Sequence, residues 1–213
     1  MKSSVIADTE SFVRTTLGNE STGHDWWHSV RVRNTALVLA HEEGADGFVV
    51  ELGALLHDIT DHKLHGGDRE KGPRMAREWL VGQGLADDVV EHVVNIVTHM
   101  SWSKSHAGNT VFDSLEMRIV QDADRLDAIG AIGIARAFAY GGYKSRPLYD
   151  PEQPFSSEYT GECAPSTLHH FYEKLLKIAD QMHTETARRL AQERHVHMEE
   201  FLKEFHEEWN GEQ

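Results

Sequence analysis

Apolar residues recur at intervals of three and four along almost the whole chain, and no stretch alternates convincingly with the two-residue period of a strand. Capping residues and glycines divide this pattern into separate helices. The clearest boundaries belong to a helix that Asp25 begins as its N-cap and Gly44 ends. The expected helices cover residues 3–18, 26–43, 47–58, 72–82, 87–100 and 113–139. The pattern therefore predicts an all-α fold.

The C-terminal third of the chain contains an irregular stretch followed by a further helical segment. Residues 141–165 hold four of the chain's five prolines, which predicts a long irregular loop or lid. From Thr167 to Trp209 the chain resumes a helical pattern, which predicts an amphipathic helix pair on the body of the domain or on a second subunit, with the core-covering role favoured. The segment shows apolar positions at alternating steps of three and four residues: Leu168, Phe171, Leu175, Ile178 and Met182. We expect a single domain over 1–213, with its core at about 20–140 and the 166–213 helices packed on that core.

Composition limits the possible settings and partners. The net charge of -14 argues against binding to duplex nucleic acid, which requires basic surfaces. The lone Cys163 excludes an intrachain disulfide and a cysteine-based zinc site. No apolar run approaches the ~18 residues of a membrane span, and the first residues lack the apolar core of a signal peptide. We therefore expect a cytoplasmic protein without membrane association.

Three predicted helices carry side chains that can bind a metal ion on their apolar stripes. His28 shares a face with Val32, the pair His57 and Asp58 ends the most apolar helix, and Asp124 follows Val120 by one turn. Buried carboxylates are costly unless they are paired or bound to a cation. Two imidazoles and two carboxylates suit Mn²⁺, Fe²⁺, Co²⁺ or Ni²⁺ and leave positions for water and substrate.

The residues alone leave a second interpretation open. Each of these side chains taken singly is more often a helix-end or core polar group than a metal ligand. Periodicity also fails to separate Asp124 from Asp122, because Asp122 lies on the stripe of Ile119 and Leu126. A metal site and a set of structural polar groups both fit the pattern.

Short motifs in this order resemble the HD-domain phosphohydrolase superfamily. They are a lone His28, then Ala-Leu-Leu-His-Asp-Ile at 54–59, then Ala-Asp-Arg-Leu-Asp-Ala-Ile at 123–129. The chain is similar in particular to the single-domain YpgQ-like bacterial branch, through Gly-Gly-Asp at 66–68, Phe-Ala-Tyr-Gly-Gly at 138–142 and His-Phe-Tyr-Glu-Lys-Leu at 170–175. The resemblance covers nearly the whole chain. It implies an HD-domain helical bundle with an added C-terminal helical segment.

The resemblance also implies a set of metal ligands. Carried over by position, they are His28, His57, Asp58 and Asp124, and the motif selects Asp124 over Asp122. The implied cofactor is one divalent ion, Mn²⁺ foremost, with Mg²⁺, Co²⁺, Ni²⁺ and Fe²⁺ as alternatives. Relatives that hold two metals need a His-His pair, whereas Met100 follows His99 in this chain, which favours one metal.

The implied reaction splits a nucleoside triphosphate into monophosphate and pyrophosphate. Asp58 would act at the metal, and Asp61, three residues later, would orient or deprotonate the attacking water. The candidate phosphate-binding cations are Lys63, Lys104, Arg125, Lys144 and Arg146. Of these, Lys63 and Lys104 are preferred because they follow elements of the site. Arg125 could equally form a helix–helix salt bridge, and Lys144 and Arg146 could be ordinary surface charges.

Several other functions fit the same residues. A nucleoside 5′-monophosphatase or a cyclic nucleotide phosphodiesterase could use the same metal. A di-iron oxygenase would require His99 as a further ligand, and a nucleotide-binding regulator would have lost turnover. In each phosphohydrolase reading the partner is a small nucleotide, and the protein is a monomer or a homodimer.

Overall fold

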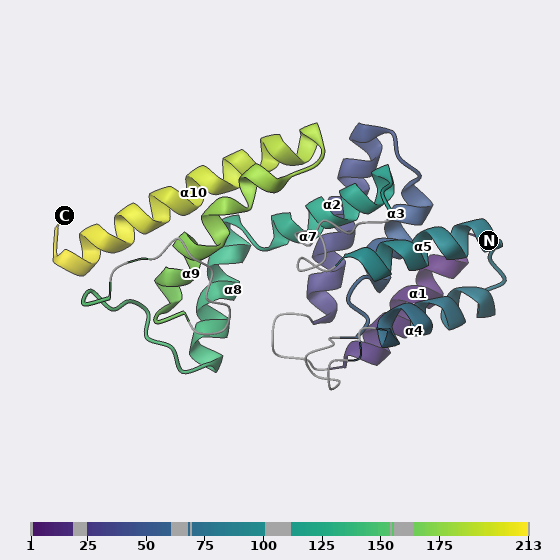
Figure 1. Cartoon of the computed structure of the whole chain (residues 1–213), viewed down its shortest axis with the longest axis horizontal. Helices are drawn as coiled ribbons and strands as arrows, with labels where there is room; N and C mark the ends of the chain where they lie inside the picture. The colour runs from purple at the N-terminus through teal and green to yellow at the C-terminus, as the bar shows by residue number, and fades with distance from the viewer. Residues whose placement is uncertain are drawn as a thin grey trace. The chain divides into compact units, whose positions relative to one another are not determined.

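The computed structural model describes residues 2–18, 25–60, 68, 70–100, 112–153, 155 and 164–212. Within these ranges all regular structure is helical, as Figure 1 shows, so the all-α prediction is confirmed. The chain forms two compact units, Met1–Asp124 and Arg125–Gln213, and each is described by itself. The expectation of a single domain stays a prediction.

The first unit is organised around α3 (Gly47–Leu56). From Phe48 to Leu56 every residue of this helix is buried except Glu51, which is half-buried. It packs against α1 (Lys2–Leu17), α2 (Trp26–Glu43) and α5 (Asp87–His99). The unit also contains α4 (Lys71–Gly82), which packs on α5, and the part of α7 (Leu115–Asp127) up to Asp124. An all-apolar helix can be stable only when other helices surround it, which explains why α3 is central.

Local sequence signals set the ends of the helices that lead to the candidate site. The Asp25 carboxylate accepts a hydrogen bond of 2.8 Å from the backbone N–H of His28, which caps α2 as predicted. Gly44 ends α2 with a φ of 72°, a left-handed conformation that glycine adopts without strain. Asp46 caps α3 in the same way, accepting 2.9 Å from the N–H of Phe48. These caps fix where His28 and the end of α3 fall.

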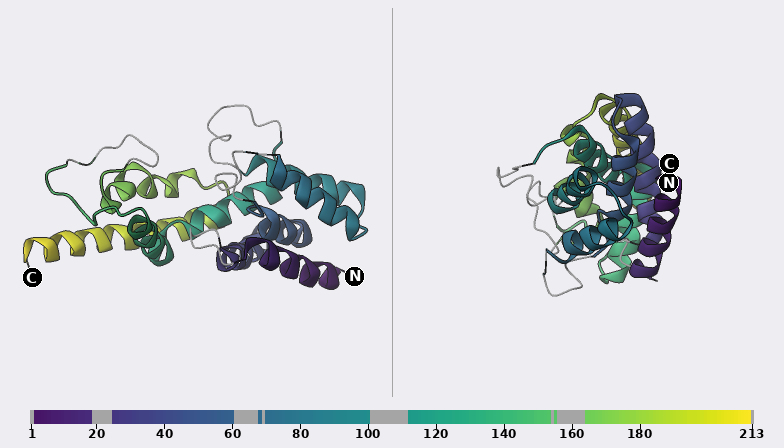
Figure 2. Two further views of the ribbon diagram at one scale, coloured as in Figure 1. Left: turned by 90° about the horizontal axis from the view of Figure 1, so that it is seen from below. Right: turned by 90° about the vertical axis from the view of Figure 1, so that its right-hand side faces the viewer.

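The second unit has an aromatic core. It contains α8 (Gly130–Tyr143), α9 (Thr167–Glu173), two 3₁₀ turns (Leu175–Lys177 and Ala179–Gln181) and the long α10 (Glu185–Asn210), seen in Figures 1 and 2. Phe138 of α8 lies 6.1 Å from Phe171 of α9 and 5.9 Å from Phe201 of α10, measured between ring centroids. Rings at these separations bury a large apolar area and stabilise the packing of the three helices.

The prediction of one helix over 113–139 is wrong. The structure ends α7 at Asp127 and begins α8 at Gly130, whose φ of 73° turns the chain. The apolar pattern continues across the break, since Leu126 and Ile129 are both buried. Periodicity could not reveal a change of direction at a glycine that also fits a helical pattern.

The C-terminal prediction needs a similar correction. The helix expected to run through Met182 ends at Glu173 and gives way to the two 3₁₀ turns, although all five predicted apolar positions are buried. Residues 141–143, expected in the loop, form the last turn of α8, whereas 144–153 are not helical. Residues 154 and 156–163 of the predicted loop lie outside the described residues.

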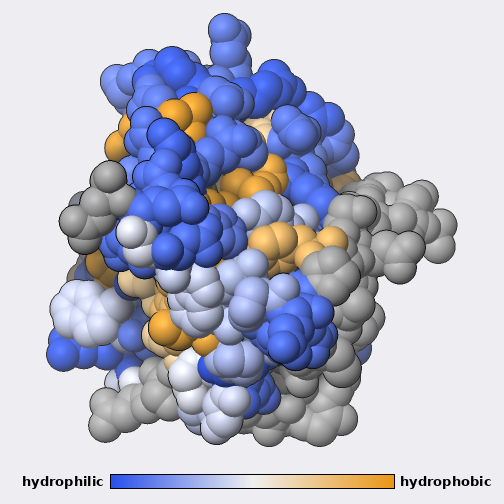
Figure 3. Space-filling view, turned by 90° about the vertical axis from the view of Figure 1, so that its left-hand side faces the viewer, coloured by the Kyte–Doolittle hydropathy of each residue, from blue (hydrophilic) through white to orange (hydrophobic). Residues whose placement is uncertain are grey.

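No helix in the described ranges is long and apolar enough to cross a membrane. On the face shown in Figure 3, hydrophilic residues surround separate apolar patches.

A close approach at Gly53 gives a test of how tightly α3 is packed. A Cβ atom at this position would lie 3.2 Å from Cγ2 of Ile96 and 3.4 Å from Cγ2 of Val120. Gly53→Val should therefore lower the free energy of unfolding by about 1–3 kcal/mol through overpacking. The measurement is urea unfolding followed by circular dichroism.

Gly82→Val is the matched control, because a Cβ atom at Gly82 meets nothing within 4 Å. This exposed change should alter the free energy of unfolding by only about 0.5 kcal/mol. Equal effects of the two substitutions would contradict the packing described for α3.

Candidate metal centre

Two buried histidines meet in the first unit. His28 lies in the first turn of α2 and is fully buried, and His57 directly follows α3 with its side chain 4% exposed. Their Nε2 atoms are 3.3 Å apart, and the two rings are inclined at 63° with centroids 5.3 Å apart. The sequence separates these residues by 29 positions, and the packing of α3 on α2 brings them together.

The backbone determines which nitrogen of His57 faces its partner. Its Nδ1 lies 2.7 Å from the carbonyl oxygen of Ala54, one turn earlier. Because a carbonyl can only accept, Nδ1 carries the hydrogen and donates it. In the neutral ring Nε2 then presents a lone pair toward His28, the arrangement typical of metal-binding histidines. Sequence reasoning missed this contact, although the three-residue spacing from Ala54 to His57 could have indicated it.

Two carboxylates complete the cluster. The ligand atoms of His28, His57 and Asp58 all lie within 4.8 Å of one another, and no other such group occurs in the described parts of the chain. From α7, the Oδ1 atom of Asp124 lies 3.5 Å from Nε2 of His28 and 4.0 Å from Nε2 of His57. The Asp124 side chain is 39% exposed, so one side of the cluster is open to solvent.

The structure separates the two aspartates that periodicity could not. A helix turns by about 100° per residue, so Asp122 and Asp124 point to nearly opposite sides of α7, about 160° apart. Asp124 faces the histidines, whereas Asp122 is fully buried. The pKa of Arg118 is raised mainly by its hydrogen bond to Asp113, with a smaller contribution from the charge of Asp122.

The donor atoms fit a single divalent ion. Two nitrogens held at ~2.1 Å from one ion, with an angle of ~90–110° between them, lie about 3.0–3.4 Å apart. The observed separation of the His28 and His57 Nε2 atoms, 3.3 Å, falls in this range. A mixed set of imidazole and carboxylate donors suits borderline to hard divalent metals.

The other predicted residues either lie away from the cluster or fall outside the described ranges. His99, which a di-iron oxygenase would need, is not in the cluster, and its Nδ1 lies 2.8 Å from the carbonyl oxygen of Asn95 in its own helix. In the second unit, Arg125 is buried and donates 2.8 Å to the carbonyl oxygen of Gln181. Three predicted residues lie outside the described ranges: Asp61, Lys63 and Lys104.

The remaining two predicted cations lie beside tyrosines in the second unit. The Nζ atom of Lys144 is 5.6 Å from the ring centroids of both Tyr140 and Tyr143. The guanidinium of Arg146 is 5.6 Å from the Tyr140 ring. Tyr143 and Lys144 are exposed, so this cluster of rings and charges is accessible to a ligand.

Comparison with known proteins extends these observations. The chain matches the HD domain family over residues 26–129, a range that includes His28, His57, Asp58 and Asp124. It is 40% identical to YpgQ of Bacillus subtilis strain 168 over 201 residues. This alignment covers 94% of this chain and 92% of that protein.

Solved structures agree with the sequence match. An HD-superfamily hydrolase from Bacillus thuringiensis is 40% identical, with a TM-score of 0.81 over 99% of both chains. The structure of Bacillus subtilis YpgQ in complex with ADP is 37% identical, with a TM-score of 0.76 over 95% of this chain and 97% of that one. Since both sequence and fold match over nearly the whole length, the chain belongs to the HD superfamily of hydrolases.

Proposed function

We propose that this chain is a nucleotide pyrophosphohydrolase that converts a (deoxy)nucleoside triphosphate to its monophosphate and pyrophosphate. Its cofactor would be one divalent ion, Mn²⁺ foremost, held by His28, His57, Asp58 and Asp124. The observation that supports the metal site most directly is the convergence of two buried imidazole Nε2 atoms and the Asp124 carboxylate within 4.0 Å.

The chain's own residues would share the work of the site. The ion would lower the pKa of a coordinated water and offset charge on the phosphoryl oxygens. His28 and His57 would hold the ion from buried positions, whereas the partly exposed Asp124 lies on the open side of the cluster. Asp61 would orient or deprotonate the attacking water, a role that rests on its position three residues after Asp58.

Two observations support a nucleotide as substrate. A relative with 37% identity, Bacillus subtilis YpgQ, was solved with ADP. In this acidic chain, the segment 128–149 contains no Asp or Glu, and it carries Lys144 and Arg146 beside Tyr140. Tyrosine rings and cations side by side offer a stacking surface for a base and charges for phosphates.

The product depends on how the phosphates are held. We propose that Lys63 and Lys104, which follow elements of the metal site in the sequence, bind the β- and γ-phosphates of the substrate. Attack would then fall on the α-phosphorus, and pyrophosphate would leave intact. Arg125 is less suited to this role, because it is buried and donates to the carbonyl oxygen of Gln181.

The metal assignment can be tested with two matched substitutions in α7. Asp124→Asn should remove most of the bound Mn²⁺, because it deletes a charged ligand, whereas Asp122→Asn should retain the metal. Metal content is measured by elemental analysis after loading and desalting, with circular dichroism to check folding. Retention of Mn²⁺ by Asp124→Asn together with its loss from Asp122→Asn would show that the wrong aspartate was chosen.

The role of Asp61 can be separated from metal binding. Asp61→Ala should keep a full complement of Mn²⁺ but reduce kcat by roughly 10² to 10⁴, the usual contribution of general-base assistance. Steady-state kinetics and metal analysis on the same sample provide the two readouts. A kcat close to that of the unmodified enzyme would exclude this residue from the chemistry.

The product distinguishes the proposal from its rivals. Incubation of the Mn²⁺-loaded enzyme with a panel of nucleoside triphosphates should give monophosphate and pyrophosphate, without orthophosphate or diphosphate, as followed by ³¹P NMR. Parallel reactions with nucleoside monophosphates and cyclic nucleotides are the controls. Orthophosphate release from a monophosphate at a comparable kcat/KM would identify a nucleotidase instead.

A further inference from the structure

We propose that Arg194 and Arg136 are positioning residues for Asp124, because they hold the final turn of α7, on which Asp124 lies. The inference rests on the proposed role of Asp124 as a metal ligand. It concerns two residues distant from Asp124 in the sequence, neither of which is proposed to contact the metal or the nucleotide.

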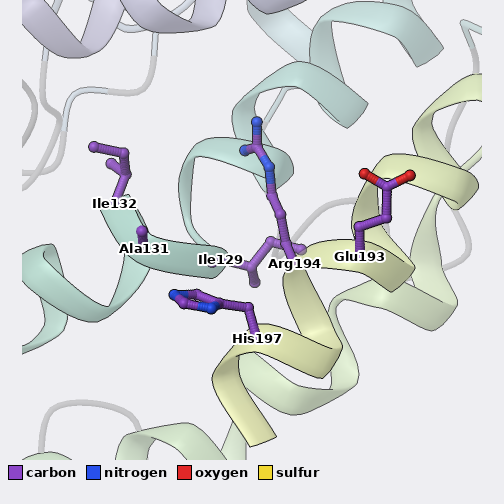
Figure 4. Close-up of a pocket in the computed structure, with 7 residues that line it drawn as sticks. Ile129, Ala131, Ile132, Glu193, Arg194 and His197 are labelled. Carbon is purple, nitrogen blue, oxygen red and sulfur yellow. The ribbon is translucent and has the colours of Figure 1, made fainter. Parts of the chain in front are cut away.

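Arg194 of α10 binds the end of α7. Its guanidinium donates to the carbonyl oxygen of Leu126, two residues after Asp124. The last carbonyls of a helix lack partners within the helix and carry a partial negative charge, so a cation that donates there stabilises the turn. Figure 4 shows Arg194 extending away from α10 beside Ile129.

The stem of Arg194 is also fixed. A Cβ atom on Gly130 would lie 2.9 Å from Cγ of Arg194, so the absence of a side chain at Gly130 leaves room for the stem. Both residues line a pocket of about 340 Å³ formed by the start of α8 and by α10 (Figure 4). Burial lowers the pKa of Arg194, and a partly buried guanidinium is costly unless it is hydrogen-bonded. The hydrogen bond to the carbonyl oxygen of Leu126 therefore supplies a partner that the partly buried guanidinium needs.

Arg136 of α8 holds the next residue. Its Nη1 atom donates 2.6 Å to the carboxylate of Asp127 and 3.3 Å to the carbonyl oxygen of the same residue. The Asp127 side chain is 5% exposed and that of Arg136 is 24% exposed, so solvent screens this pair only partly. Two arginines from different helices thus bind Leu126 and Asp127, the last two residues of α7.

Asp124 is the proposed ligand that depends most on such support. Its side chain is 39% exposed, compared with 1% for His28 and 4% for His57. Helix ends open locally more readily than helix centres, and Asp124 is three residues from the end of α7. The two imidazoles are enclosed by the protein, whereas the carboxylate is partly open to solvent, so the position of its backbone matters more for its placement.

The test measures the affinity of the metal-free protein for Mn²⁺ by electron paramagnetic resonance. Arg194→Met keeps an unbranched stem beside Gly130 but removes the donor, and it should weaken Mn²⁺ binding about tenfold, as loss of groups that orient ligands commonly does. Arg194→Lys should restore most of the affinity, since it returns a charged donor. Unchanged affinity in Arg194→Met would overturn the proposal.

Arg188→Met is the matched control. Arg188 also belongs to α10 and also donates to backbone carbonyls, those of Met182 and His183, but it does not bond to α7 through these contacts. It should lower the melting temperature as Arg194→Met does and leave the Mn²⁺ affinity unchanged. An equal loss of affinity in both variants would indicate general destabilisation and refute the specific role. If Arg194→Met does not fold, Arg136→Met supplies the same comparison.

A double substitution separates this inference from the proposed function. In an Asp124→Asn background, Arg194→Met should cause no further loss of Mn²⁺ affinity, because it acts through Asp124. If Asp124→Asn binds Mn²⁺ normally, the ligand assignment and the positioning role both fail. If Asp124→Asn loses the metal but Arg194→Met does not, the ligand assignment stands and the positioning role alone fails.

Discussion

The meeting of His28 and His57 inside an apolar helical core is the constraint on which the candidate site depends. Buried imidazoles are tolerated only when their nitrogens have partners. The carbonyl oxygen of Ala54 satisfies Nδ1 of His57, which turns Nε2 toward His28 at 3.3 Å. The Asp25 carboxylate accepts a hydrogen bond from the backbone N–H of His28. This cap sets the start of α2 and therefore the position of His28. The site is thus assembled from helix ends whose positions are fixed by caps and by the burial of α3.

The cluster is buried on the histidine side and open at Asp124. A hydrolytic site needs this asymmetry, because the metal ligands must be held firmly while water and substrate must enter. The open side brings a physical cost, since a carboxylate near a helix end has little packing to hold it. The contacts of Arg194 and Arg136 with the last residues of α7 offset that weakness through the backbone. They stabilise the end of α7, after which Gly130, with a φ of 73°, turns the chain into α8.

Charge explains how so acidic a chain could accept a polyphosphate. With a net charge of -14, the protein as a whole repels anions. A divalent ion in the histidine–aspartate cluster would reverse this locally, and the segment 128–149, which contains no Asp or Glu, would add the charges of Lys144 and Arg146. The tyrosine rings beside Lys144 and Arg146 could stack on the base of a nucleotide, whereas an inorganic phosphate has no ring to stack on them.

Features that depend on neighbouring residues could be predicted from the sequence: the all-α fold, the caps at Asp25 and Gly44, and the apolar stripes that carry the histidines and aspartates. The tertiary structure was needed to show that Asp124 lies within 4.0 Å of both histidines, because α7 is apolar on more than one face and periodicity fits Asp122 equally well. It also decided that α7 and α8 are separate helices, since the apolar pattern continues through Gly130. The contact between Arg194 and Leu126 joins residues 68 positions apart. No local pattern encodes such a contact, because it arises only when the packing of whole helices brings distant residues together.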